Sequence, residues 1–232
     1  MQREVRFNDL FNATFETILA NRTATLLFLA VTVPIGGASV ALLDTASGNP
    51  AVLFSPTSRS LGTVAGIVAM ILFGMVAQYW FIMAMLRRPL HGDFDRLLPY
   101  LRISLLSTIG LVLGMLLLVI PGFIFATRCL LVTPMVLERK VPAMDSFVES
   151  WERTQSNAWS IFFVIVVLLM LIWIPNGLGQ FLSDRLTGNA RIAGWLIESL
   201  TSPIWTTVGT GMMVGAYRLL GDPNRELEEV FA

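Results

Sequence analysis

Long apolar runs alternate with short polar stretches along the whole chain. The runs cover residues 23–43, 61–86, 103–120, 123–137, 158–175 and 195–220. None alternates apolar and polar residues as a strand does, and about 20 apolar helical residues cross the hydrocarbon core of a bilayer. Lipid offers no hydrogen-bond partners, so a crossing segment must satisfy its own backbone. The pattern predicts an all-α, polytopic membrane protein, a six-span helical bundle forming one membrane domain over residues 1–232.

An amphipathic stretch precedes each pair of runs, at about residues 5–20, 90–102 and 142–157. Apolar residues recur there at spacings of three and four, which builds a stripe along a helix. Next to a span, such a helix lies in the membrane interface, so we predict three cytoplasmic interfacial helices. The first and third also share residues at one constant offset: Asp9, Phe11, Phe15, Glu16 and Asn21 match Asp145, Phe147, Trp151, Glu152 and Asn157. This predicts an internal repeat, although amphipathic helices before spans resemble one another in general.

The charges favour one orientation of this bundle. Only 14% of the 232 residues are charged, against about 25% in a soluble domain. With six spans, twelve of the 16 Lys and Arg residues fall on the face that holds both termini, and three fall on the other. Basic residues prefer cytoplasmic loops. We therefore expect a multi-pass protein of the bacterial inner (plasma) membrane with both termini in the cytoplasm.

The apolar stretch over residues 103–137 is interrupted only by Pro121 and Gly122. Proline removes a helical hydrogen bond and glycine frees the backbone, so we expect a tight hairpin turn there on the outer side. Pro134 is expected to kink the cytoplasmic end of the short fourth span. The alternative is a single kinked span, which would place Arg139 and Lys140 outside.

Three glycine pairs with four-residue spacing lie inside predicted spans. They are Gly62 and Gly66, Gly110 and Gly114, and Gly211 and Gly215. Glycines one turn apart let two helix backbones approach closely in a membrane. We expect them to pack helices within the bundle, and the alternative is that one of them forms a homo-oligomer.

Two ionisable residues fall inside predicted spans, where such residues are candidates for function. Arg128 lies six residues beyond Gly122, about 9 Å below the outer surface at the helical rise, and Glu198 lies at a similar depth. We predict that the two form an ion pair. A functional Arg128 would offer its fork of donors to a phosphate or carboxylate. A structural Arg128 would only bridge two spans or extend its charge to the interface.

The side chains needed for catalysis or metal binding do not occur in recognisable patterns. His91 is the sole histidine, and neither a phosphate-binding glycine loop nor a nucleophile elbow is present. The single cysteine, Cys129, is expected to be an inert packing residue. The zero net charge argues against nucleic-acid binding. We therefore predict a protein that is not an enzyme and needs no metal or other cofactor.

Residues 119–160 resemble a bacterial membrane family. It comprises the YciC-like inner-membrane proteins and the membrane domain fused to some glycerophosphodiester phosphodiesterases. The residues that carry the resemblance are Pro121, Gly122, Arg128, Pro134, Glu138, Ala143, Ser150, Thr154 and Trp159. The chain departs from the pattern at Ser156 and Asn157, where the family has glycine. The resemblance implies a role in the cell envelope that involves lipids, and it carries no catalytic site, because the phosphodiesterase chemistry belongs to a separate soluble domain.

Ser150 and Thr154 lie one turn apart on the third interfacial helix. They could bond to Glu138 or to a lipid headgroup, but a backbone hydrogen bond is the simpler interpretation. The main functional hypothesis is a protein that binds or organises lipids or assists envelope homeostasis. Its partners would be membrane lipids, with a second copy or other envelope proteins as further candidates. The alternative is a transporter of small solutes or lipids, as broken helices and Pro203 inside the last span suggest.

Overall fold

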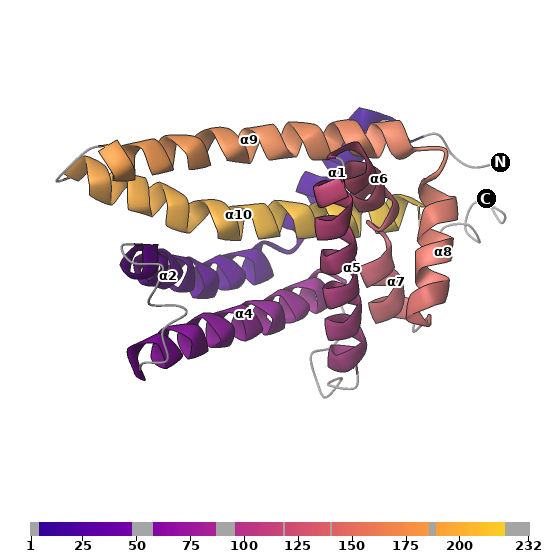
Figure 1. The fold of residues 1–232 in the computed structure, drawn as a ribbon. Helices are drawn as coiled ribbons and strands as arrows, with labels where there is room; N and C mark the ends of the chain where they lie inside the picture. The colour runs from indigo at the N-terminus through magenta and orange to yellow at the C-terminus, as the bar shows by residue number, and fades with distance from the viewer. Residues whose placement is uncertain are drawn as a thin grey trace. The chain divides into compact units, whose positions relative to one another are not determined.

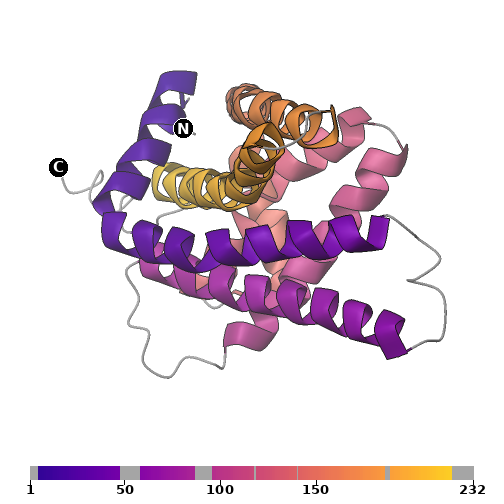
Figure 2. The same ribbon diagram turned by 90° about the vertical axis from the view of Figure 1, so that its left-hand side faces the viewer.

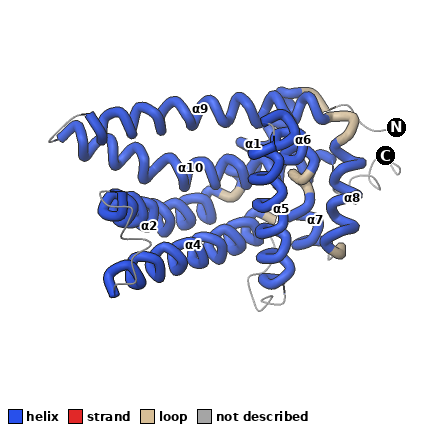
Figure 3. Tube along the Cα trace, in the orientation of Figure 1, coloured by secondary structure: helices blue, strands red, loops and turns tan. Residues whose placement is uncertain are grey.

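The structure, a computed structural model, describes residues 5–47, 58–86, 96–117, 119–139, 141–185 and 189–220. Every regular element in these ranges is an α-helix (Figure 3). The helices are α1 (Phe7–Ala20), α2 (Arg22–Ser47), α4 (Ser58–Met85), α5 (Leu97–Leu117), α6 (Val119–Arg128), α7 (Val132–Arg139), α8 (Ala143–Thr154), α9 (Ala158–Arg185) and α10 (Asn189–Leu220). The predicted all-α class is confirmed.

Several helices are long and apolar enough to cross a membrane. Among the described residues these are Val64–Met85 in α4, Leu97–Gly114 in α5 and Ala158–Leu182 in α9. A fourth candidate combines α1 with residues 22–37 of α2, which are separated by a break at Asn21. Three to four candidate spans indicate a multi-pass membrane protein. Six spans are not shown: of the predicted spans, 195–220 in α10 is not among these candidates, and 123–137 is divided between α6 and α7.

The described part of the interfacial helix predicted at 90–102 is continuous with the helix that follows it. Helix α5 begins at Leu97 and continues without a break through the apolar run to Leu117. The helical periods of residues 97–102 and 103–117 join in one continuous helix, because no glycine or proline ends the first segment at residue 102. Residues 87–95, with His91, lie outside the described residues.

The predicted turn at Pro121 and Gly122 is also wrong in position. Both residues belong to α6, which begins at Val119, so neither of them forms a turn. Pro134 likewise lies in the first turn of α7, not at a kink near the end of a span. Proline is tolerated in the first turn because its missing N–H needs no helical partner there. Each proline thus lies in the first turn of a helix. The predicted span over 123–137 is divided between two helices, which are separated at Cys129–Leu131.

Helices α5, α6 and α7 nevertheless form a hairpin. A side chain at Gly110 of α5 would meet the ring of Phe125 in α6. Farther back along α5, Ile103 packs with Val132 and Val136 of α7 in a buried cluster. At the start of α5, the Arg96 guanidinium donates to the carbonyl of Leu137. The broken pair α6–α7 therefore runs antiparallel to α5 along most of its length, as the hairpin interpretation requires.

The chain folds into two compact units. Unit 1 comprises residues 1–22, 82–168 and 208–232, and unit 2 comprises residues 23–81 and 169–207. The fully buried large side chains belong to unit 1: Leu10, Ile82, Met83, Met85, Ile103, Leu131, Met135, Leu137, Ile161, Val132, Val164 and Val214. Cys129 is half-buried and packs against this core, as expected.

The described part of unit 2 has few buried side chains. Helices α2 and α4 run side by side (Figures 1 and 2), and Phe28 stacks on Phe81 with ring centroids 4.3 Å apart. Most other large apolar side chains of unit 2 point outward, Trp173 with 72% and Ile174 with 70% of their surface exposed. Such exposure is unfavourable in water over several helices and is the normal state of helices surrounded by lipid.

Among the glycines whose surroundings the structure describes, two groups bring helix backbones together. In unit 1, a Cβ on Gly215 would lie 2.9 Å from the carbonyl oxygen of Ala13, and one on Gly211 would lie 2.7 Å from Cγ1 of Ile18. Helix α1 therefore packs on this glycine pair of α10, as predicted. In unit 2, a Cβ on Gly36 would lie 2.8 Å from the carbonyl oxygen of Ser199, a contact that none of the sequence motifs indicated.

For the other two glycine pairs, close backbone packing stays a prediction. A Cβ on Gly62 would meet nothing within 4 Å, and Gly66 is half-exposed. Gly110 faces the Phe125 ring, and Gly114 is half-exposed. Close packing within the chain is thus shown for one predicted pair of three.

Helices α1 and α8 support the predicted internal repeat. At the constant sequence offset, Leu10 and Thr14 of α1 correspond to Ser146 and Ser150 of α8, and all four are buried. Asn21 and Asn157 follow the two helices. The amide N–H of each donates to the carbonyl three residues earlier, Ile18 or Thr154, at 3.2 Å in both cases. The two helices thus share their buried register and their terminating turn.

Candidate functional site

Helix α8 is amphipathic, but its fully buried side chains are small and polar, while Phe147 on its apolar side packs only partly against the core. Its buried residues are Ser146, Ser150 and Thr154, which are four apart and form one line. Its exposed residues include Met144 (69%), Val148 (60%) and Trp151 (47%). A helix in water buries its apolar stripe, whereas one at a membrane surface presents that stripe to lipid.

The buried hydroxyls are compatible with the protein interior because the backbone satisfies them. The Ser146 hydroxyl donates to the carbonyl of Pro142 at 2.9 Å, and the Thr154 hydroxyl donates to that of Ser150 at 2.8 Å. The hydroxyls of Ser150 and Thr154 thus bond to backbone carbonyls, which was the simpler of the two interpretations of these residues. Small hydroxyl side chains also allow α8 to approach its neighbours closely.

Ser150 joins α8 to the break between α6 and α7. Its hydroxyl donates to the carbonyl of Arg128, the last residue of α6, and accepts the N–H of Leu131 at 3.3 Å. Both backbone groups belong to helix ends that have no intrahelical partner. A single side chain therefore satisfies both sides of the break and fixes where Arg128 lies.

Arg128 lies against α8, at the end of α6 and not within a continuous fourth span. Its guanidinium carbon is 5.2 Å from the centroid of the Trp151 ring, within the range of a cation–π contact. One terminal nitrogen donates to the Trp151 carbonyl at 3.4 Å. Within the described part of the chain, the buried Nε has no hydrogen-bond partner. The sequence identified Arg128 and Trp151 separately but offered no reason to join them.

Glu198, the predicted partner of Arg128, lies in α10. Its side chain is outside the described residues. The ion pair between the two therefore stays a prediction. The described contacts of Arg128 are all with α8, so the residue already has a structural partner that does not depend on Glu198.

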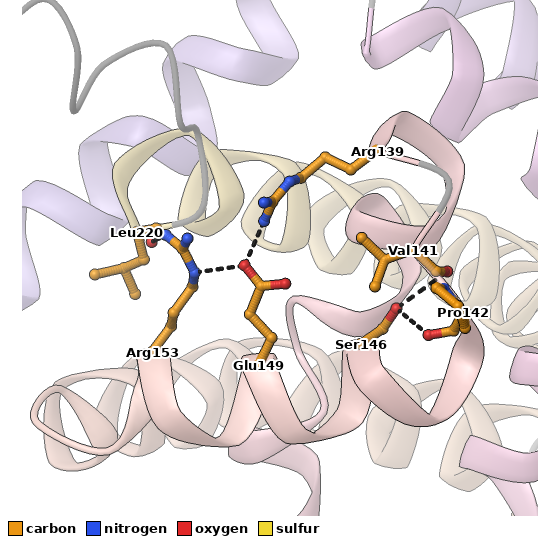
Figure 4. A network of polar contacts seen from close by, with 7 residues as sticks. All are labelled: Arg139, Val141, Pro142, Ser146, Glu149, Arg153 and Leu220. Carbon is orange, nitrogen blue, oxygen red and sulfur yellow. Dashed lines mark hydrogen bonds and ion pairs between the residues drawn. The ribbon is translucent and has the colours of Figure 1, made fainter.

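An ionic network lies on the polar flank of α8 (Figure 4). A carboxylate oxygen of Glu149 accepts hydrogen bonds from Arg139 of α7 and from Nε of Arg153, the latter at 3.0 Å. Arg153 also donates to the carbonyl of Leu220, the last residue of α10, at 3.0 Å. Glu138, the carboxylate expected at the membrane boundary, is half-buried in the last turn of α7. The centre of the network is instead Glu149, and its four-residue spacing from Arg153 was the available signal.

Arginines also bind the carbonyl ends of other helices in unit 1. Arg96 donates to Leu137 near the end of α7, and Arg218 donates to Met85 at the end of α4 at 2.9 Å. Arg153 likewise donates to the last carbonyl of α10, so the C-terminal carbonyls of α7, α4 and α10 each accept a hydrogen bond from an arginine. The partial negative charge of a helix C-terminus favours a cation there. These three arginines of the basic excess counted in the sequence therefore have structural partners.

The described residues contain no group of three or more His, Cys, Asp or Glu side chains placed to hold a metal ion. The most distinctive chemistry in unit 1 is the Arg128–Trp151 contact at the edge of the outward apolar face of α8. No protein-family model, curated protein or solved structure matches the chain. The resemblance over residues 119–160 therefore stays a prediction, and the case for this site rests on its geometry.

Proposed function

We propose that this chain is a non-enzymatic, multi-pass protein of the bacterial inner membrane that binds and organises lipids of the cytoplasmic leaflet. The burial pattern of α8 is the observation that carries the proposal. Its hydroxyl face is packed against the protein while Met144, Val148 and Trp151 face outward. The resemblance to envelope proteins supports the same role.

Helix α8 has three faces, which match the three environments of a membrane surface. At 3.6 residues per turn, Ser146 and Ser150 define the side toward the protein, and Met144 and Val148 define the lipid side. Asp145 is exposed about a quarter turn from Met144 and defines the water side. Helix α1 has the same position in the repeat and exposes Phe15 (39%) and Leu19 (69%).

Both termini are proposed to lie in the cytoplasm. Because α5 and the broken pair α6–α7 run antiparallel, they return the chain to the side from which it came. This holds for the six crossings predicted from the sequence and equally for four crossings with a re-entrant hairpin. Residues 110–126 contain no charged side chain, which favours a hairpin tip that stays in the hydrocarbon. The excess of Lys and Arg on the terminal side places that side in the cytoplasm.

Spin labels on two adjacent residues of α8 test the proposal. In a Cys129→Ala background reconstituted into liposomes, cysteines replace Met144 or Asp145, both of which are exposed. The label at 144 should be relaxed more by oxygen than by a water-soluble nickel chelate, and the label at 145 should show the reverse. Equal, water-like accessibility at both positions would rule out an interfacial α8. Carboxyl-terminal reporter fusions check the orientation, and a periplasmic C-terminus would contradict it.

A further inference from the structure

Arg128 carries a positive charge without a carboxylate partner among the described residues. Its described contacts are the Trp151 ring and the Trp151 carbonyl, both of which leave the charge uncompensated. Two neighbouring arginines, Arg139 of α7 and Arg153 of α8, instead share the carboxylate of Glu149. A guanidinium has five N–H donors, so Arg128 keeps several for another acceptor.

The position of Arg128 indicates which acceptor this is. Trp151 is 47% exposed and lies on the outward side of α8 with Met144 and Val148. An indole beside apolar residues favours the headgroup level of a membrane. At that level the abundant anion is the phosphate of a phospholipid, and a guanidinium binds phosphate in a fork geometry. The apolar neighbours would contact the acyl chains of the same molecule, which a free phosphate lacks.

We propose that the Arg128–Trp151 pair binds the phosphate of an anionic phospholipid in the cytoplasmic leaflet. A lipid with net negative charge is favoured because no headgroup ammonium competes with Arg128 for the phosphate. Ser150 acts as a positioning residue, since its hydroxyl fixes the backbone at both ends of the turn that begins at Arg128. This inference rests on the proposed function and adds to it the class of lipid and the group that selects it.

Native mass spectrometry of the full chain tests the site. The protein in detergent is titrated separately with phosphatidylglycerol and phosphatidylcholine, and the retained lipid is counted. Arg128→Gln should weaken phosphatidylglycerol binding about tenfold, the size expected for a lost charge-assisted hydrogen bond. The wild type should retain phosphatidylcholine less well than phosphatidylglycerol. Unchanged phosphatidylglycerol binding in Arg128→Gln, or equal retention of the two lipids by the wild type, would overturn the proposal.

Arg22→Gln is the matched control. Arg22 is an exposed arginine at the start of α2, directly after the α1 turn that corresponds to the end of α8. Its substitution removes the same charge and should leave phosphatidylglycerol binding unchanged. An equal loss in both variants would indicate attraction to total charge and would contradict a site at Arg128.

The unfolding temperature without lipid shows whether Arg128→Gln folds. If it does not fold, two further variants test the site. Arg128→Lys keeps the charge but loses the fork, and should weaken phosphatidylglycerol binding less than a neutral residue would. Trp151→Leu removes the ring beneath the guanidinium and should also weaken it. Wild-type affinity in both would contradict the site.

Measurements of the unfolding temperature distinguish binding of a phospholipid from binding of free phosphate. Phosphatidylglycerol should raise the unfolding temperature of the wild type, and inorganic phosphate at the same ionic strength should not. Equal protection by both would assign the site to a soluble anion and overturn the lipid proposal. The spin labels at 144 and 145 distinguish the two levels of failure. Lipid-like accessibility at 144 with unchanged binding in Arg128→Gln refutes only the site, whereas water-like accessibility at 144 refutes the interfacial function too.

Discussion

Helices α1 and α8 share one pattern of buried positions but are held in place by different forces. Helix α1 packs by backbone proximity, with Ala13 against Gly215 of α10. Helix α8 is held by directional polar bonds, with Ser150 on the α6–α7 break and Glu149 between two arginines. The polar docking of α8 places the Arg128 guanidinium beside the exposed Trp151 ring, which is why the candidate site lies at α8.

The largest expected effect concerns the docking of α1. Gly215→Ala places a methyl group 2.9 Å from the carbonyl oxygen of Ala13, and backbone atoms cannot easily yield. Overpacking of this kind costs about 1–3 kcal/mol. Gly62→Ala is the matched control, because its methyl group meets nothing within 4 Å and alanine stabilises a helix by up to about 1 kcal/mol over glycine. Unfolding temperatures in detergent should therefore move in opposite directions.

The second effect compares Ser150 with Thr14, its counterpart in the repeat. Ser150→Val leaves the Leu131 N–H and the Arg128 carbonyl without this partner, which costs about 1–3 kcal/mol of unfolding free energy. The Thr14 hydroxyl bonds only within its own helix, to Leu10 at 2.8 Å, so Thr14→Val should cost much less. Thermal unfolding measures both variants. Equal losses would show that the two helices are held in the same way and would remove the contrast.

A smaller difference is expected at the two asparagine turns. The Asn157 side-chain carbonyl accepts the N–H of Val5 at 2.7 Å in a buried setting, across 152 residues of sequence. Asn157→Ala should cost about 1–2 kcal/mol, because a buried donor loses its partner. The Asn21 side chain bonds to Thr17 in the preceding turn, so Asn21→Ala should cost less. Faster hydrogen exchange at the Val5 amide in Asn157→Ala alone would confirm the assignment.

The smallest effect concerns the ionic network. Glu149→Gln removes two ion pairs whose side chains are 21–28% exposed. Partly exposed pairs contribute about 0.2–1 kcal/mol each, and salt reduces that contribution. Asp145→Asn on the water side of α8 is the control with the same loss of charge. The difference in unfolding temperature between the two variants should shrink as salt is added, and a difference independent of salt would exclude ion pairing as its cause.

The sequence predicted those features that depend on local periodicity. The apolar runs indicated the helices α2, α4, α9 and α10, and the offset between Phe11 and Phe147 indicated the repeat. The errors arose where one residue type has two structural uses. Pro121 and Pro134 were interpreted as interruptions, but in the first turn of a helix proline is a favourable residue.

The site was only half predictable for a different reason. Arg128 was conspicuous as a charge in an apolar run, whereas its contact with Trp151 depends on how the α6–α7 break docks on α8. Docking of this kind is set by a hydrogen bond between residues 22 apart, Ser150 and Arg128. Neither periodicity nor composition records such a bond. The Glu149–Arg153 pair lies within one helix and could have been predicted from its spacing.

The brevity of α6 has a consequence for biogenesis. Its ten residues extend about 15 Å, half of what the translocon requires of an autonomous transmembrane segment. If the hairpin lies in the membrane as proposed, α6 is too short to partition into the bilayer by itself when it leaves the ribosome. The two legs of the hairpin would then have to enter the lipid together, as one insertion unit.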